Sequence, residues 1–221
     1  MHVRRLALGL GMVLWLTACA ARESPPPSSP SSAAPARAVV NPANIKRIRS
    51  ALPSGYEIAD VAGPVSVAGL WGFGPGWSAD PARCAVLADP APGDASARGY
   101  SASGQGGTVY VVVAATPTTP GAGLLVECAQ WTMTFAHTTG EVTVGNPPRI
   151  DGADTVALTA STRTVVESGR ETDGQASTVQ AYLDGHVVFV TLVTDPGSPY
   201  PPLNSQFITD LLTATVTALR G

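Results

Sequence analysis

Residues 177–194, STVQAYLDGHVVFVTLVT, carry the clearest hairpin signal in the chain and set the class of the fold. Asp184 and Gly185 favour a type I′ turn, because both central positions of that turn need a positive φ. The runs on either side are rich in valine, threonine and aromatic residues, which are enriched in strands. We therefore expect two antiparallel strands joined by a two-residue turn.

Further strands are expected before this hairpin. Residues 99–116, GYSASGQGGTVYVVVAAT, predict two strands about a glycine turn, and the apolar second half is typical of a central strand. Residues 132–137 and 141–144 flank Thr138-Thr139-Gly140, which we interpret as another hairpin turn. The run at 154–166 is rich in threonine and valine and predicts one more strand.

Several segments show the signals of helices. Asn41-Pro42 and Asp80-Pro81 are helix starts, the first before apolar residues at helical spacing and the second before residues 82–87. Residues 124–128 place Leu124, Leu125 and Cys128 on one helical face, and residues 203–219 predict an amphipathic terminal helix. Together with the strands, these helices predict an α+β fold in which helices pack on one face of an antiparallel sheet.

The start of the chain has the order of a secretory signal. Arg4 and Arg5 precede an uncharged run at 6–16, which is shorter than the roughly 20 residues that a membrane span requires. Leu16-Thr17-Ala18-Cys19 resembles the lipobox of bacterial lipoproteins. The resemblance implies cleavage after residue 18 and a diacylglycerol thioether on Cys19. The alternative is an ordinary signal peptide that happens to contain a cysteine.

Residues 19–40 predict a disordered tether that follows a signal peptide at 1–18. Five prolines and five serines lie among the alanines at 20–40, so this segment has little apolar surface to bury. Glycosylation of its serines is left open. Residues 41–221 are of a length that suits one α+β domain.

The charge distribution argues against a nucleic-acid partner. From residue 50 onward fifteen acidic residues stand against six arginines, whereas nucleic-acid-binding surfaces are basic. Arg37, Lys46, Arg47 and Arg49 form a basic cluster near the tether. This cluster either contacts anionic lipid head groups or is the solvated face of the first helix.

The cysteine count predicts one disulfide. With Cys19 lipidated, Cys84 and Cys128 remain as an even pair in an exported protein. Closing a loop of about 45 residues stabilises the fold by roughly 4 kcal/mol in the chain-entropy treatment. Two cysteines without a neighbouring histidine supply too few ligands for a metal site, so no metal or other cofactor is predicted.

Several stretches resemble a mycobacterial family of lipoproteins whose domain has no assigned function. They include LPSGYEIADVAG, WGFGPGWSADPARCAVLADP, ECAQWTMTF and VESGRETDGQASTVQAYL, and the resemblance covers most of the chain from residue 41 onward. The layout is more distantly similar to the extracellular sensor domains of mycobacterial receptor serine/threonine kinases, which are disulfide-bonded α+β domains with a cleft for an unknown ligand. This chain departs from them in having one cysteine pair instead of two and no kinase.

No catalytic residues are predicted. His137 and His186 both lie beside expected turns, and the chain contains neither an H-E-x-x-H zinc motif nor a G-x-S-x-G nucleophile elbow. The glycine-rich stretch GYSASGQGG lacks the lysine of a phosphate-binding loop and precedes a strand.

Two loops hold candidate binding residues. Trp71, Phe73 and Trp77 stand among glycines in LWGFGPGW, where aromatic rings either line the edge of an apolar pocket or close the end of the core. In ESGRETDG, three charged residues either form a surface that binds a partner or are simply solvated: Glu167, Arg170 and Glu171.

The sequence therefore favours a cell-envelope lipoprotein, anchored by lipid on the extracytoplasmic face of the cell membrane. Its domain is expected to be non-catalytic and to bind a ligand or partner of the envelope, in the manner of a sensor. One alternative is an envelope hydrolase whose active site is assembled from distant residues, which would need a cleft with convergent titratable groups. Another is a structural or assembly factor, which would expose a broad apolar patch.

Overall fold

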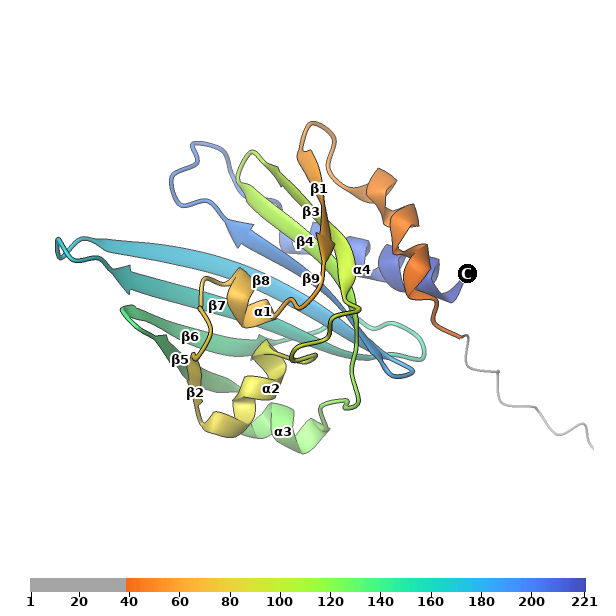
Figure 1. Cartoon of the computed structure of the whole chain (residues 1–221), viewed down its shortest axis with the longest axis horizontal. Coiled ribbons are helices and arrows are strands. Elements are labelled where there is room, and N and C mark those ends of the chain that lie inside the picture. Colours follow the sequence, from red (N-terminus) through yellow and green to blue (C-terminus); the bar gives the residue numbers. More distant parts are fainter. Residues whose placement is uncertain (1–38) are drawn as a thin grey trace, which may run out of the picture. The chain divides into compact units, whose positions relative to one another are not determined.

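The computed structural model describes residues 39–221 (Figure 1). The signal peptide at 1–18, the lipobox cysteine Cys19 and almost all of the tether at 19–40 lie outside the described residues. Within residues 39–221, nine strands form an antiparallel sheet in the order β1-β3-β4-β9-β8-β7-β6-β5-β2. None of the helices in this part of the chain is both long enough and apolar enough to cross a membrane.

The strands are β1 (Glu57–Ala62), β2 (Ser78–Asp80), β3 (Arg98–Gly104), β4 (Gly107–Ala115), β5 (Gln130–Phe135), β6 (Thr138–Gly145), β7 (Asp154–Val165), β8 (Glu171–Leu183) and β9 (His186–Thr194). The α-helices are α1 (Val67–Leu70), α2 (Ala85–Ala88), α3 (Ala122–Glu127) and α4 (Ser205–Arg220), and the 3-10 helices are η1 (Pro42–Ala51) and η2 (Ala82–Cys84). The α+β class and the antiparallel sheet are confirmed.

The expected hairpin at 177–194 is present as β8 and β9. Asp184 and Gly185 have φ angles of 35° and 79°, as a type I′ turn requires. Leu183 pairs with His186, and the register continues to Ala176 opposite Val193. The neighbouring pair β4–β9 is also antiparallel, which places the apolar strand β4 in the interior of the sheet.

The turn between β5 and β6 lies earlier than Thr138-Thr139-Gly140, so that interpretation is wrong. The chain reverses at Ala136, whose φ is 49°, and the three residues belong to β6. The physical reason lies in the packing of Gly140, because a Cβ atom there would stand 2.7 Å from Cζ of Phe73. Glycine at this position permits the approach of a ring and does not mark a turn.

Helices lie on both faces of the sheet, so the expected packing on one face is not confirmed. Helices η1 and α4 cover one face, where Ile48 and Leu212 share a buried cluster with Val111. Helices α1 and α2 cover the other face, where Leu87 shares a second cluster with Val112 (Figure 1). Successive residues of β4 are apolar on both sides, and each side therefore needs a cover.

The two longest helices both begin after an asparagine that acts as an N-cap. Helix η1 begins after Asn41, whose side chain accepts a hydrogen bond from the amide of Ala43 at 3.0 Å. Helix α4 begins after Asn204, whose side chain accepts one from the amide of Phe207 at 2.8 Å. These side chains satisfy amides that have no partner within the helix, which is the usual role of an N-cap.

The predicted disulfide is confirmed between Cys84 and Cys128, with an S–S distance of 2.04 Å. Both cysteines are fully buried. The bond joins the end of η2, directly before α2, to the residue that follows α3. It therefore fixes the position of α2 against a segment that lies 44 residues away in the sequence.

Buried polar contacts also fasten the short helices to the sheet. Gln180 donates from its amide nitrogen to the carbonyl of Leu87 in α2 at 2.8 Å, and its oxygen accepts from the hydroxyl of Tyr182. Trp71, next to α1, donates its indole N–H to Thr178 at 3.1 Å. The side chains of Gln180, Tyr182 and Trp71 thereby keep hydrogen-bond partners, and burial raises the pKa of Tyr182 well above its ordinary value.

Candidate functional site

A surface pocket lies beside α2, with a volume of about 450 Å³, which is within the range of small-molecule sites. We call it the α2 pocket. Most of its surface is apolar, and its lining comes from α2, from the segments that follow α2 and β4, and from the loop before β2. The lining residues are Trp77, Ala85, Val86, Asp89, Pro90, Ala91, Pro92, Ala115, Pro117 and Thr118.

Prolines and a buried threonine give the pocket its shape. Helix α2 ends at Ala88, before Pro90, because a proline in a helix interior would remove a backbone hydrogen bond. Thr116 is buried and donates its hydroxyl to the carbonyl of Pro90 at 2.6 Å. Its amide donates to the carbonyl of Gly185 in the β8–β9 turn at 2.9 Å. The segment after α2 and the segment after β4 form two walls of the pocket. They are therefore held to each other and to the sheet.

Asp94 does not line the pocket, but it holds the wall at the end of β4 in place. One of its carboxylate oxygens accepts from the amide of Ala115 at 2.7 Å, and the other accepts from the amide of Ser96 at 2.9 Å. Desolvation acts to raise the pKa of Asp94, but the hydrogen bonds from Ser96 and Ala115 and the charge of His186 together hold it below its ordinary value. The pocket wall at Ala115 is thus positioned by an ionised group.

Asp89 brings a carboxyl group to the otherwise apolar lining. Its backbone amide donates to the carbonyl of Ala85, which closes the last turn of α2. Its Oδ1 atom is buried and has no hydrogen-bond partner among the described residues. Desolvation raises the pKa of this carboxyl group. Asp89 as a whole is only partly buried and lines the pocket, so a ligand there would contact this residue.

The structure separates the three candidate aromatic residues. Trp71 and Phe73 are 4% and 3% exposed and belong to the core, whereas Trp77 is partly buried and lines the α2 pocket. Gly74 lies against the ring of Phe135 and Gly140 against the ring of Phe73, so the loop that carries Trp77 packs closely on the β5–β6 hairpin. Only Trp77 is placed where a ligand in this pocket would touch it.

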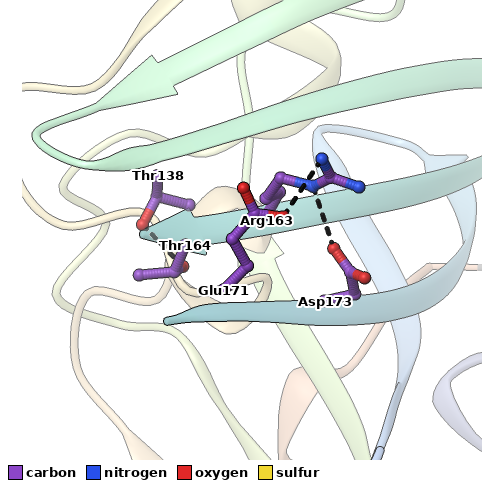
Figure 2. A network of polar contacts seen from close by, with 5 residues as sticks. All are labelled: Thr138, Arg163, Thr164, Glu171 and Asp173. Atoms are coloured by element: carbon purple, nitrogen blue, oxygen red, sulfur yellow. Dashed lines mark hydrogen bonds and ion pairs between the residues drawn. The ribbon is translucent and has the colours of Figure 1, made fainter. Parts of the chain in front are cut away.

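A second hollow, of about 650 Å³, lies on the sheet surface formed by β5, β6, β7 and β8. We call it the β5–β8 groove. Most of its lining residues carry polar side chains, and the full set is Thr132, Met133, Thr134, Thr139, Gly140, Glu141, Ser161, Thr162, Arg163, Asp173 and Gln175. Arg163 forms ion pairs with Asp173 at 3.1 Å and with Glu171 at 3.3 Å. Figure 2 shows these three side chains. These charged groups are more than half exposed and already satisfy one another.

The three charged candidates of the β7–β8 loop are not equivalent. Glu171 begins β8 and pairs with Arg163. Glu167 and Arg170 are exposed in the turn, which a backbone hydrogen bond from Val166 to the carbonyl of Arg170 closes at 2.9 Å. Binding of a partner at these residues stays a prediction.

Neither histidine lines either hollow. His137 is exposed in the turn between β5 and β6, and His186 begins β9 with its Nδ1 atom 3.2 Å from the carbonyl of Asp184. No group of three or more potential metal ligands occurs within residues 39–221. The α2 pocket therefore provides a ligand with a cavity, an apolar surface and one carboxyl group.

Sequence reasoning did not single out Asp89. The signal was present in the stretch Asp89-Pro90-Ala91-Pro92, where a carboxylate stands at the end of a short helix before two prolines. The segment after β4, which is distant in the sequence, lines the same pocket, so the local sequence does not show that Asp89 lies in one.

The fold is shared with an uncharacterised protein from Mycobacterium smegmatis, described as the Rv0999 ortholog, whose crystal structure is known. The two chains are 22% identical with a TM-score of 0.62, and the match covers 82% of this chain and 98% of the other. This likeness concerns the fold alone. No curated protein matches the chain. Residues 41–220 match the family described as Domain of unknown function (DUF5642), and the chain belongs to that family.

Proposed function

We propose that this domain is a non-catalytic binding module that takes an apolar ligand in the α2 pocket. The observation that supports this most directly is the pocket itself, which has a volume of about 450 Å³ and a mostly apolar lining. Apolar lining with a few polar groups is what small-molecule sites generally show.

The construction of the pocket also favours binding. The disulfide at Cys84 precedes α2, and Gln180 holds the last turn of that helix through the carbonyl of Leu87. Thr116 ties the two proline-containing walls together. A ligand that enters a site built in this way has little protein to order, which lowers the entropic cost of binding.

The chemistry of the lining argues for binding in preference to catalysis. Asp89 is the one ionisable side chain that lines the α2 pocket, and no serine, cysteine or histidine stands beside it in the lining. A hydrolase needs a nucleophile or activated water together with a group that moves protons. In the β5–β8 groove, Asp173 is engaged by Arg163.

An apolar probe with its own fluorescence tests this proposal. N-phenylnaphthylamine should brighten in a saturable manner when it is titrated into the purified protein. Ala115→Trp places a large ring at an exposed position of the lining and should weaken binding by about tenfold or more. The matched control is Ala59→Trp, at an exposed position of β1 outside the pocket, which should bind as the wild type does. Equal titrations for all three proteins, or no saturable binding by the wild type, would overturn the proposal.

We further propose that the module is held at the extracytoplasmic face of the cell membrane by a lipid on Cys19. The order of a basic start, an apolar run and a lipobox supports this. Two or three acyl chains anchor a protein firmly, whereas one chain holds only reversibly. The distant resemblance of the sequence to kinase sensor domains motivates the proposal of a sensor-like role at that location. Membrane fractionation of cells that express the wild type or Cys19→Ala tests the anchor, and equal sedimentation of both with membranes would reject it.

A further inference from the structure

Asp89 is the polar feature of the α2 pocket that lacks a partner. Its Oδ1 atom is buried, and no N–H or O–H group of the described residues donates to it. Elsewhere near this pocket the polar groups are paired, as with Thr116 and the carbonyl of Pro90. The residue as a whole is only partly buried and lines the pocket, so a ligand there would meet a carboxyl group whose hydrogen-bonding capacity the protein leaves incomplete.

The charge of the lining restricts what that donor can be. No lysine, arginine or histidine lines the pocket, and Thr118 is the only hydroxyl-bearing residue there. An anionic head group would meet a carboxylate of the same sign without a nearby positive charge. A positively charged head group would form a charge-assisted hydrogen bond, which is stronger than a neutral one.

We propose that the α2 pocket selects an amphiphile with an amine head group, and that Asp89 binds the ammonium group while the apolar lining covers the chain. This inference rests on the proposed function, because it names the ligand class of the same pocket. Trp77, Val86 and Pro117 contribute apolar surface for a chain of methylene groups. The raised pKa of Asp89 is consistent with a carboxyl group that gains from a cationic partner.

Three probes with the same chain separate the contribution of the head group from that of the chain. Dodecylamine, dodecanol and dodecanoate are each used below their micelle concentrations to displace bound N-phenylnaphthylamine. The wild type should bind the amine about tenfold more tightly than the alcohol, and the acid most weakly. Asp89→Asn removes the charge with little change of shape and should reduce the preference for the amine to about threefold or less.

The control is Glu141→Gln, which makes the same chemical change at an exposed carboxylate of the β5–β8 groove. It should keep the wild-type order of the three probes. Thermal unfolding of each variant confirms that the protein is folded before it is titrated. An unchanged preference for the amine in Asp89→Asn would overturn the assignment of Asp89.

The outcomes also separate this inference from the proposed function. If the three probes displace the dye equally well from the wild type, or the acid does so best, the pocket binds apolar chains but the amine assignment is wrong. If neither the dye nor any probe binds saturably, the proposed function is wrong and the ligand class is wrong with it.

Discussion

The ring of Phe73 packs directly against the backbone of Gly140. A Cβ atom at residue 140 would lie 2.7 Å from Cζ of that ring and 3.3 Å from the carbonyl oxygen of Ser161. Phe73 is itself 3% exposed, so the ring has little room to move away. The contact fastens the loop that carries Trp77 to strand β6, and it links the edge of the α2 pocket to the sheet.

Gly140→Ala should therefore destabilise the protein by about 1–3 kcal/mol, because the added methyl group overpacks a rigid site. Chemical denaturation of the wild type and the variant measures this difference through the shift of the denaturation midpoint. Gly145→Ala is the matched control in the same strand, since the nearest atom to its Cβ would be 3.9 Å away. That variant should be neutral or slightly stabilising, because alanine lowers the entropy of the unfolded chain.

A double-mutant cycle checks the cause of the loss. Phe73→Leu shortens the side chain that Gly140→Ala would strike, so the two changes together should cost less than the sum of the single changes. A strictly additive result would show that the ring is not the source of the strain.

Two of the predictions that the structure confirms depended on residues adjacent in the chain, and a third depended on the number of cysteines. The turn at Asp184-Gly185 and the helix start at Asn41-Pro42 are local, so the free energies that favour them are present in a short peptide. The pairing of Cys84 with Cys128 followed from counting cysteines in a chain that was expected to be exported.

The incorrect turn at residues 138–140 has a specific cause. Glycine is used both where φ is positive and where another group approaches the backbone, and sequence alone does not separate these uses. Gly140 serves the second purpose. The positive φ of the turn is taken by Ala136, a residue type that gives no turn signal.

The sequence did not predict which helices cover which face of the sheet. The apolar run from Val109 to Ala114 shows that β4 is buried on both faces, yet it does not say which segments cover each face. Asp89 presents the same difficulty. It lines one pocket together with Pro117, which is distant in the sequence, and the hydroxyl of Thr116 joins their two segments through the carbonyl of Pro90.

Removal of the disulfide by Cys84→Ala with Cys128→Ala should lower the free energy of unfolding by about 4 kcal/mol, in line with the length of the loop it closes. Changing both residues avoids a single buried thiol. Because the bond directly precedes α2, binding of N-phenylnaphthylamine should weaken as well. Denaturation and dye titration of the oxidised wild type and the double variant measure both effects. Full affinity in a destabilised variant would show that the pocket does not depend on this bond.

Asp94 should stabilise the protein in its ionised form. Its pKa is held below the ordinary value, so the unfolded state binds more protons between the folded and the unfolded pKa. The stabilisation is fully present above the unfolded pKa and is lost as the pH falls through the folded pKa. Asp94→Ala should cost about 1 kcal/mol at pH 7 and less at pH 3, because the hydrogen bonds to Ser96 and Ala115 are lost from a largely exposed site. A loss of equal size at both pH values would contradict this account.

Asp89 should have the opposite effect. Burial raises its pKa above the ordinary 3.8, so the folded state binds more protons than the unfolded state in the interval between the two values. Stability should therefore fall as the pH rises through that interval, and the ionised carboxylate remains as a cost at neutral pH. Asp89→Asn removes this cost, and the variant should unfold at a higher temperature than the wild type at pH 7 and at a similar temperature below pH 4. Thermal unfolding at a series of pH values measures both curves. A variant less stable than the wild type at pH 7 would mean that the protein itself stabilises the ionised carboxylate of Asp89, so that this group does not lack a partner.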